Sequence, residues 1–209
     1  HPGTMGGPAI ADLLFGIESP SGKLPVTFPR MVGQVPIYYA HKHGGKPATP
    51  ETFQHIDDIP ARMPQSSSGW VSSHLDAGYT PLYPFGYGLS YTEFRYSDVA
   101  VSSPEALPGE TVTVSARVTN TGDVAATEVV QLYVRDLVGN VTRPVKELKG
   151  FQRIRLQPGE GRTVEFAIGP DDLAFYDRNM NLTTEPGEFH AWIGGSSETG
   201  LRTSFTLVD

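Results

Sequence analysis

The second half of the chain alternates apolar and polar residues with a period of two, the pattern of half-buried β-strands. The clearest case is residues 112–119, where valine or alanine alternates with threonine, serine or arginine. Similar alternation marks residues 130–134, 164–168, 189–193 and 201–207, and further strands are expected at 94–101 and 145–151. Pairs such as Pro-Gly and Gly-Gly separate these segments. The pattern predicts about seven strands, as in an immunoglobulin-like β-sandwich.

The first forty residues show two different patterns of apolar residues, one helical and one alternating. Pro8–Ile17 carries its isoleucines and leucines at helical spacing, which predicts a helix that ends near Gly16. Lys23–Phe28 alternates and predicts a short strand, which Pro25 confines to a sheet edge or makes irregular. One helix and one strand cannot bury both apolar faces alone. We therefore expect these elements to need sheet strands from polypeptide outside this chain, and expect the visible N-terminus to be a cut or the edge of a partial sequence.

The middle of the chain shows no sustained periodicity. Residues 40–80 are rich in Gly, Pro, Ser and His and predict a long irregular loop, and such loops are usually functional or mobile. Residues 82–91, LYPFGYGLSY, then place four aromatic side chains among glycine and proline. We expect this block to form an ordered, aromatic crossing between domains.

Composition narrows the possible partners. The 209 residues carry a net charge of −7 and no cluster of Lys or Arg, which argues against nucleic acid or an anionic membrane as a partner. No apolar stretch approaches the roughly 20 residues that cross a bilayer. The sequence has no cysteine, so disulfides and thiolate metal sites are excluded.

Two sequence blocks carry a family resemblance. Ser19–Pro29 (SPSGKLPVTFP) and Leu82–Tyr91, in this order and spacing, resemble the C-terminal part of glycoside hydrolase family 3 β-glucosidases, above all the periplasmic β-glucosidases of Gram-negative bacteria. The resemblance extends through residues 1–15, 33–39 and 143–151. It implies a mainly β chain in three parts. Residues 1–39 are the tail of an α/β sandwich domain, 40–92 a long loop and aromatic linker, and 93–209 a fibronectin type III-like domain.

The same resemblance implies a function for the whole enzyme. Family members of this kind hydrolyse terminal β-D-glucosyl residues with retention of configuration, which takes two carboxyl groups about 5–5.5 Å apart. The resemblance places both carboxyl groups upstream of the matched blocks, so we expect no catalytic residue and no cofactor in this chain. The expected partners are the upstream barrel and α/β sandwich domains and a β-glucoside or oligosaccharide substrate. The implied location is periplasmic or secreted.

Several residues in the chain could still contact a ligand. Six carboxylates lie in the first half without matching a catalytic motif: Glu18, Glu51, Asp57, Asp58, Asp76 and Glu93. Four histidines share the long loop, His41, His43, His55 and His74, but their spacing matches no metal-ligand motif, so no metal site is expected. Trp70, in a Ser/Gly-rich stretch, is the one candidate for a contact with substrate.

Trp192 supports an alternative function. It alternates with Phe189, Ala191 and Ile193, so it should point away from the sandwich core. A large outward aromatic marks a contact surface, either for a neighbouring domain or for carbohydrate. The alternative hypothesis is therefore a non-enzymatic β-sandwich module that binds carbohydrate or protein.

Overall fold

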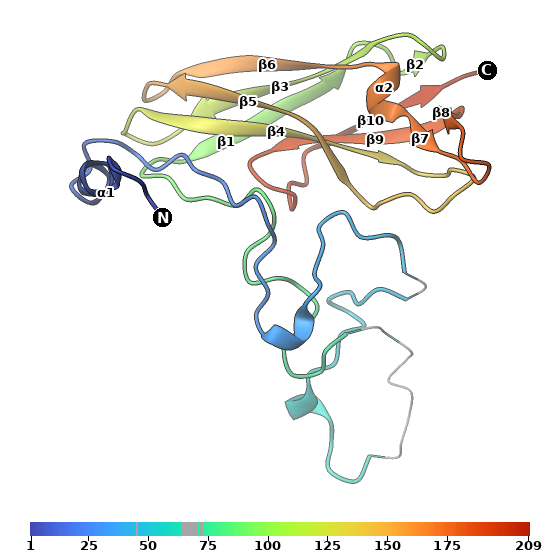
Figure 1. Ribbon diagram of the computed structural model, residues 1–209, viewed down its shortest axis with the longest axis horizontal. Helices are drawn as coiled ribbons and strands as arrows, with labels where there is room; N and C mark the ends of the chain where they lie inside the picture. Colours follow the sequence, from blue (N-terminus) through green and yellow to red (C-terminus); the bar gives the residue numbers. More distant parts are fainter. Residues whose placement is uncertain (45, 64–70, 72) are drawn as a thin grey trace.

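The computed structural model describes residues 1–44, 46–63, 71 and 73–209. Figure 1 shows a β-sandwich built from the second half of the chain, with the irregular segment before it extending away from one side. The helix α1 (Gly6–Leu14) lies near one end of the sandwich.

Two sheets make up the sandwich. The smaller sheet has the order β1-β3-β6, with β1 Phe94–Val101, β3 Val112–Asn120 and β6 Gly161–Ile168. The larger sheet has the order β2-β10-β9-β4-β5, with β2 Glu105–Ala106, β10 Arg202–Leu207, β9 Gly187–Gly194, β4 Ala126–Asp136 and β5 Glu147–Leu156. A short helix α2 (Pro170–Leu173) and the pair β7 (Phe175–Tyr176) and β8 (Leu182–Thr183) connect β6 to β9.

The period-two pattern explains the core between the sheets. In β3 the valines and Ala116 are buried, while Thr113, Ser115, Arg117 and Thr119 lie on the other face. Phe189 of β9 and Phe205 of β10 stack with ring centroids 5.3 Å apart. The prediction of about seven strands in a sandwich is confirmed. The strand expected at 145–151 begins slightly later and runs on to Leu156.

The helix expected at Pro8–Ile17 is present but shifted toward the N-terminus, as α1. It ends before Gly16, whose φ of 71° suits a residue without a β-carbon. Its apolar stripe is open to solvent, since Ile10 is 49% exposed and Leu14 is 74% exposed. The helix thus folds without covering its apolar face.

The prediction of a regular strand at Lys23–Phe28 is wrong. The segment is irregular, which was the other structure expected from Pro25. Only an isolated bridge joins Phe28 to Tyr83. The partner of this segment is nevertheless inside the chain, contrary to expectation. The Leu24 N–H donates to the Tyr87 carbonyl at 2.8 Å, and the Phe28 N–H donates to the Tyr83 carbonyl at 2.8 Å. Pro25 has no N–H to extend the ladder between these bonds.

The long loop is irregular, as expected. Its described residues contain neither an α-helix nor a strand, but the 3₁₀ turn η2 (Ile56–Asp58) and isolated bridges at Lys42 and His74, and a similar turn η1 (Val32–Gln34) precedes it. The loop starts beside the sandwich, because the Val145 N–H donates to the His41 carbonyl at 2.9 Å. None of the helices in the described ranges is both long and apolar enough to cross a bilayer.

Candidate functional site: a polar seam on the five-stranded sheet

The outer face of β4 is covered by the chain that precedes the sandwich. Gln131 and Tyr133 lie on the face of β4 opposite the core, yet they are 3% and 0% exposed. Residues 18–24, 39 and 82–92 form the cover, and we call this contact region the seam. The seam is the place where segments far apart in the sequence meet through buried polar groups.

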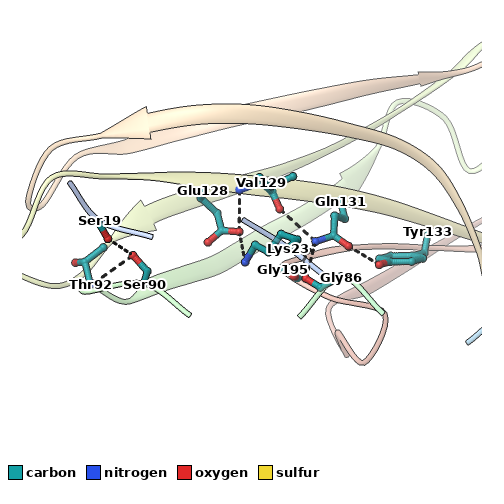
Figure 2. Close-up of polar contacts among 10 residues, drawn as sticks. All are labelled: Ser19, Lys23, Gly86, Ser90, Thr92, Glu128, Val129, Gln131, Tyr133 and Gly195. Atoms are coloured by element: carbon teal, nitrogen blue, oxygen red, sulfur yellow. Dashed lines mark hydrogen bonds and ion pairs between the residues drawn. The ribbon is translucent and has the colours of Figure 1, made fainter. Parts of the chain in front are cut away.

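Gln131 is the central connector of the seam. Its Nε2 donates to the Gly86 carbonyl at 3.1 Å and to the Gly195 carbonyl at 2.8 Å. Its Oε1 accepts a hydrogen bond from the Tyr133 hydroxyl. Figure 2 shows the Gln131 amide nitrogen directed toward Gly86 and Gly195, and the Tyr133 hydroxyl beside the amide oxygen. One buried side chain therefore joins the linker to two strands of the sandwich.

Aromatic rings fill the space beside Gln131. Phe85 stacks on Tyr39 with ring centroids 4.2 Å apart, and Tyr39 contacts Tyr133 edge-on at 5.9 Å. The Tyr39 hydroxyl accepts a hydrogen bond from the Leu148 N–H at 3.2 Å. Burial, reinforced by Tyr39, raises the pKa of Tyr133, so its hydroxyl stays protonated and remains a donor. The block at 82–91 is thus an ordered aromatic crossing, as its sequence predicts.

An ion pair closes the seam nearer to α1. Lys23 Nζ lies 2.8 Å from Glu128 Oε1, with the two side chains 15% and 6% exposed. The Val129 N–H donates to the same oxygen at 2.9 Å. Ser19 and Ser90 hydroxyls pair at 2.9 Å close by, as Figure 2 also shows. A buried pair of this kind is costly to break, because the remaining charge is left without a partner.

Lys146 ties down the loop that follows β9. Its Nζ donates to the carbonyls of Ser197 at 2.7 Å and Thr199 at 3.2 Å, and lies 4.5 Å from the Trp192 ring centre. Burial lowers the pKa of Lys146 to about 8, although the Glu198 carboxylate acts in the opposite sense. The Ser197 N–H in turn donates to the Phe85 carbonyl at 2.9 Å, so Lys146 supports the linker indirectly.

Of the carboxylates that the sequence singled out, Glu18 alone falls within the seam, where it lies 3.4 Å from Arg155. The six candidate carboxylates are all exposed, whereas a general acid is usually held in an apolar pocket that raises its pKa. His55 accepts a hydrogen bond from the Asp57 N–H at 3.2 Å and so caps η2. Within the described ranges, no group of three or more His, Asp or Glu side chains is arranged to hold a metal ion. Trp70 lies outside the described residues.

Trp192 points away from the core, as predicted, but it is half-buried. Lys146 occupies one face of its ring, and His190 contacts it at 5.5 Å between ring centroids. Sequence reasoning missed the seam residues Lys23, Glu128, Gln131, Tyr133 and Lys146. The one available signal was the pair Gln131 and Tyr133 at alternate positions of β4. The period-two pattern assigns that face of the strand to solvent, so the pattern alone does not predict that the pair is buried.

Comparison with known families agrees with this architecture. Residues 1–91 match the glycosyl hydrolase family 3 C-terminal domain, and residues 128–197 match the fibronectin type III-like domain. The seam joins these two matched parts. The chain therefore belongs to the C-terminal region of glycoside hydrolase family 3 enzymes, with a fibronectin type III-like domain after the family 3 domain.

Individual relatives sharpen the assignment. The periplasmic β-glucosidase of Salmonella typhimurium is 46% identical over 206 residues, which is 99% of this chain and 25% of that enzyme. A putative β-xylosidase of Formosa agariphila is 42% identical, covering 97% of this chain and 24% of that protein. The structure resembles the Listeria innocua β-glucosidase crystallised with glucose, with a TM-score of 0.85 and 38% identity over 99% of this chain and 27% of that one. The chain thus spans about a quarter of its curated relatives.

Proposed function

We propose that this chain is the C-terminal portion of a retaining β-glucosidase that removes terminal β-D-glucosyl residues from short saccharides or glycosides. The observation that carries the proposal is 46% identity to a periplasmic β-glucosidase along 99% of the chain. The chain contributes support instead of chemistry, and the catalytic carboxyl groups belong to the preceding part of the enzyme. The name of the Salmonella relative, a periplasmic β-glucosidase, favours a periplasmic or secreted location.

The seam indicates how the support works. Phe85 and Gly86 of the linker are held by Ser197 and Gln131 of the sandwich, and the long loop leaves from the same place. A rigid contact here fixes where the loop starts and ends, and positioning of this kind is worth large factors in rate. The proposed domain boundaries are 1–39 for the tail of the α/β sandwich domain, 40–92 for the loop and linker, and 93–209 for the fibronectin type III-like domain.

An exposed apolar surface supports the proposed partner, the upstream α/β sandwich and barrel domains. The stripe of α1 continues into a groove of about 960 Å³ between α1 and the sandwich, lined by Leu13, Leu24, Phe28, Tyr83 and Tyr87 among others. Ile17, next to α1, is 70% exposed. The exposed stripe and the apolar side of this groove together offer a contact surface, and the upstream domains are the occupant that the relatives' length makes available.

A second candidate substrate rests on a specific observation. Two Formosa agariphila relatives, 42% and 39% identical, are called a putative β-xylosidase and a β-xylosidase. The intact enzyme would then remove β-xylosyl residues with the same two-carboxylate chemistry. The alternative of a non-enzymatic module that binds through Trp192 gains no such support, and Lys146 already occupies one face of that ring.

A chimera tests the proposal. The matching C-terminal part of the Salmonella enzyme is replaced by this chain, and hydrolysis of aryl β-glucosides and aryl β-xylosides is measured beside the isolated chain. We expect the chimera to hydrolyse the glucoside with retention and the isolated chain to be inactive. Turnover by the isolated chain would show that it holds its own catalytic pair. A folded chimera that acts on neither substrate would reject the supporting role.

A further inference from the structure

A second pocket opens on the other side of the Lys23–Glu128 ion pair. It has a volume of about 520 Å³ and lies where five parts of the chain meet. These parts are Lys23, residues 87–90 of the aromatic block, residues 92–96 at the start of β1, Glu128 of β4, and the loop after β9. The pocket is large enough for a small organic ligand such as a monosaccharide.

Tyr96 lines this pocket and carries a buried, poorly satisfied hydroxyl. The ring of Tyr96 packs against the sandwich core, and its buried hydroxyl lies close to the Glu128 carboxylate without forming a well-aligned hydrogen bond within the described part of the chain. Burial raises the pKa of Tyr96, and the negative charge of Glu128 adds to the effect, so the group stays a neutral donor. Buried hydroxyl groups in proteins nearly always have a partner, which points to a ligand or water in the pocket.

The other lining groups restrict the ligand. The lining holds three carboxylates, Glu93, Glu128 and Glu198, and one cation, Lys23, and this excess of carboxylates disfavours an anion. The ion pair disfavours an apolar ligand, since such a ligand would desolvate both charges without giving them hydrogen bonds. No metal-binding cluster of three His, Asp or Glu occurs in the described residues. A neutral ligand rich in hydroxyls fits these constraints.

Hydroxyl groups can satisfy every polar group of the pocket at once. A hydroxyl accepts from Lys23 Nζ or the Tyr96 hydroxyl and donates to a glutamate oxygen. Ser196 and Thr199 add two further hydroxyls to the lining, and Tyr87 and Phe94 add aromatic surface. Aromatic rings beside mixed donors and acceptors suit the C–H faces and hydroxyls of a sugar.

We propose that this pocket binds a neutral polyhydroxylated ligand, a monosaccharide or a small polyol, through Tyr96, Glu128 and Lys23. The site goes beyond the proposed function, because it needs no catalytic group and lies between the linker and the sandwich. A ligand here bridges the two sides of the seam and stabilises their contact by mass action.

Gly195 offers a way to block the pocket without disturbing the fold. A β-carbon built on Gly195 would lie 3.5 Å from the Tyr96 hydroxyl, 3.6 Å from Glu128 Oε1 and 3.6 Å from Lys23 Nζ. These are ordinary contact distances, and the backbone of Gly195 is not left-handed. Gly195→Ala should therefore fold normally while placing a methyl group against all three polar groups.

The test is an amide NMR titration of the 209-residue chain with D-glucose, glycerol and sodium D-gluconate, each up to about 100 mM, where a millimolar site saturates. We expect saturable shifts at Gly88, Gly195 and Ser196 with glucose or glycerol, and several-fold weaker binding of gluconate because of its charge. Saturation by glucose alone identifies a monosaccharide site, and saturation by glycerol identifies a site for small polyols.

Variants separate the site from general effects of the solutes. Tyr96→Phe removes one hydroxyl and should weaken binding about five- to tenfold, and Gly195→Ala should weaken it at least as much. Tyr176→Phe, on a side chain that is 60% exposed and outside the pocket, is the matched control and should bind like the parent. The proposal is overturned if neither neutral probe saturates, if gluconate binds as well as glucose, or if shifts persist unchanged in Tyr96→Phe and Gly195→Ala.

Discussion

Gln131 approaches Gly86 so closely that position 86 has no room for a β-carbon. A β-carbon built there would lie 2.0 Å from Gln131 Oε1 and 2.9 Å from the Tyr133 hydroxyl. The φ of Gly86 is 78°, which disfavours other residues independently of space. The glycine in the aromatic block thus allows the linker to lie directly on β4.

Gly86→Ala should therefore destabilise the chain through two separate effects. The left-handed backbone costs about 1 kcal/mol, and the clash with Gln131 adds about 1–3 kcal/mol through strain or a lost buried hydrogen bond. Urea denaturation followed by circular dichroism measures the sum. Gly109→Ala is the control, because Gly109 has a φ of 95° but open space around it. Equal losses for the two variants would contradict the close contact.

Loss of either partner of the Lys23–Glu128 ion pair should lower the free energy of unfolding. Lys23→Met or Glu128→Gln alone should cost about 3 kcal/mol, since each leaves a group in a buried position without its partner. The double variant should recover part of that loss in a double-mutant cycle. Arg155 and Glu18 form the comparison pair at 3.4 Å, and both are more than half exposed. Their cycle should give less than about 1 kcal/mol.

Stability should respond to the protonation of Lys146 with a defined sign. Burial lowers the pKa of Lys146 to about 8, so above that pH the unfolded chain binds more protons than the folded one. The free energy of unfolding should then rise from pH 7.5 to pH 9.5, by about 1–2 kcal/mol from this group. Lys146→Met should lose this contribution. The measurement is the difference between parent and variant in urea unfolding at both pH values; a constant difference would contradict the prediction.

Gln131 should matter for activity in the Salmonella chimera. Gln131→Leu removes the hydrogen bonds to the carbonyls of Gly86 and Gly195 while keeping a side chain of similar volume. We expect kcat/KM on the aryl β-glucoside to fall about tenfold or more, because small displacements of positioning elements carry large rate costs. The exposed Gln157→Leu is the control and should keep full activity. Unchanged kcat/KM in Gln131→Leu would show that the seam does not position the site.

The sequence predicts the sandwich well because the alternation of apolar and polar residues within one strand shows which face of that strand is buried. In β3 the alternation of valine with threonine or serine reflects one face on the core and one in solvent. The same rule fails in β4, where Gln131 and Tyr133 occupy the face assigned to solvent. They are buried because Phe85 and Tyr39, about fifty and ninety residues earlier, fold back over them.

The segment Lys23–Phe28 fails for a related reason. Its alternation of apolar residues is real, but a strand needs a continuous partner ladder, and Pro25 interrupts the backbone bonds to the aromatic block. The hydrophobic period is a property of one segment, whereas backbone hydrogen bonding between strands depends on where the second segment lies in the fold. No feature of residues 23–28 identifies residues 82–87 as their partner.

The sequence by itself determined the strands of the sandwich, the helix, the irregular loop and the resemblance to a glycosidase family. Those features follow from local periods and from motifs that lie within short stretches of chain. Only the tertiary structure decided that Gln131 joins Gly86 to Gly195, that Lys23 pairs with Glu128, and that Tyr96 lines a pocket beside this ion pair. Such contacts depend on the close approach of segments separated by up to about a hundred residues. They contribute to stability because the fold buries them.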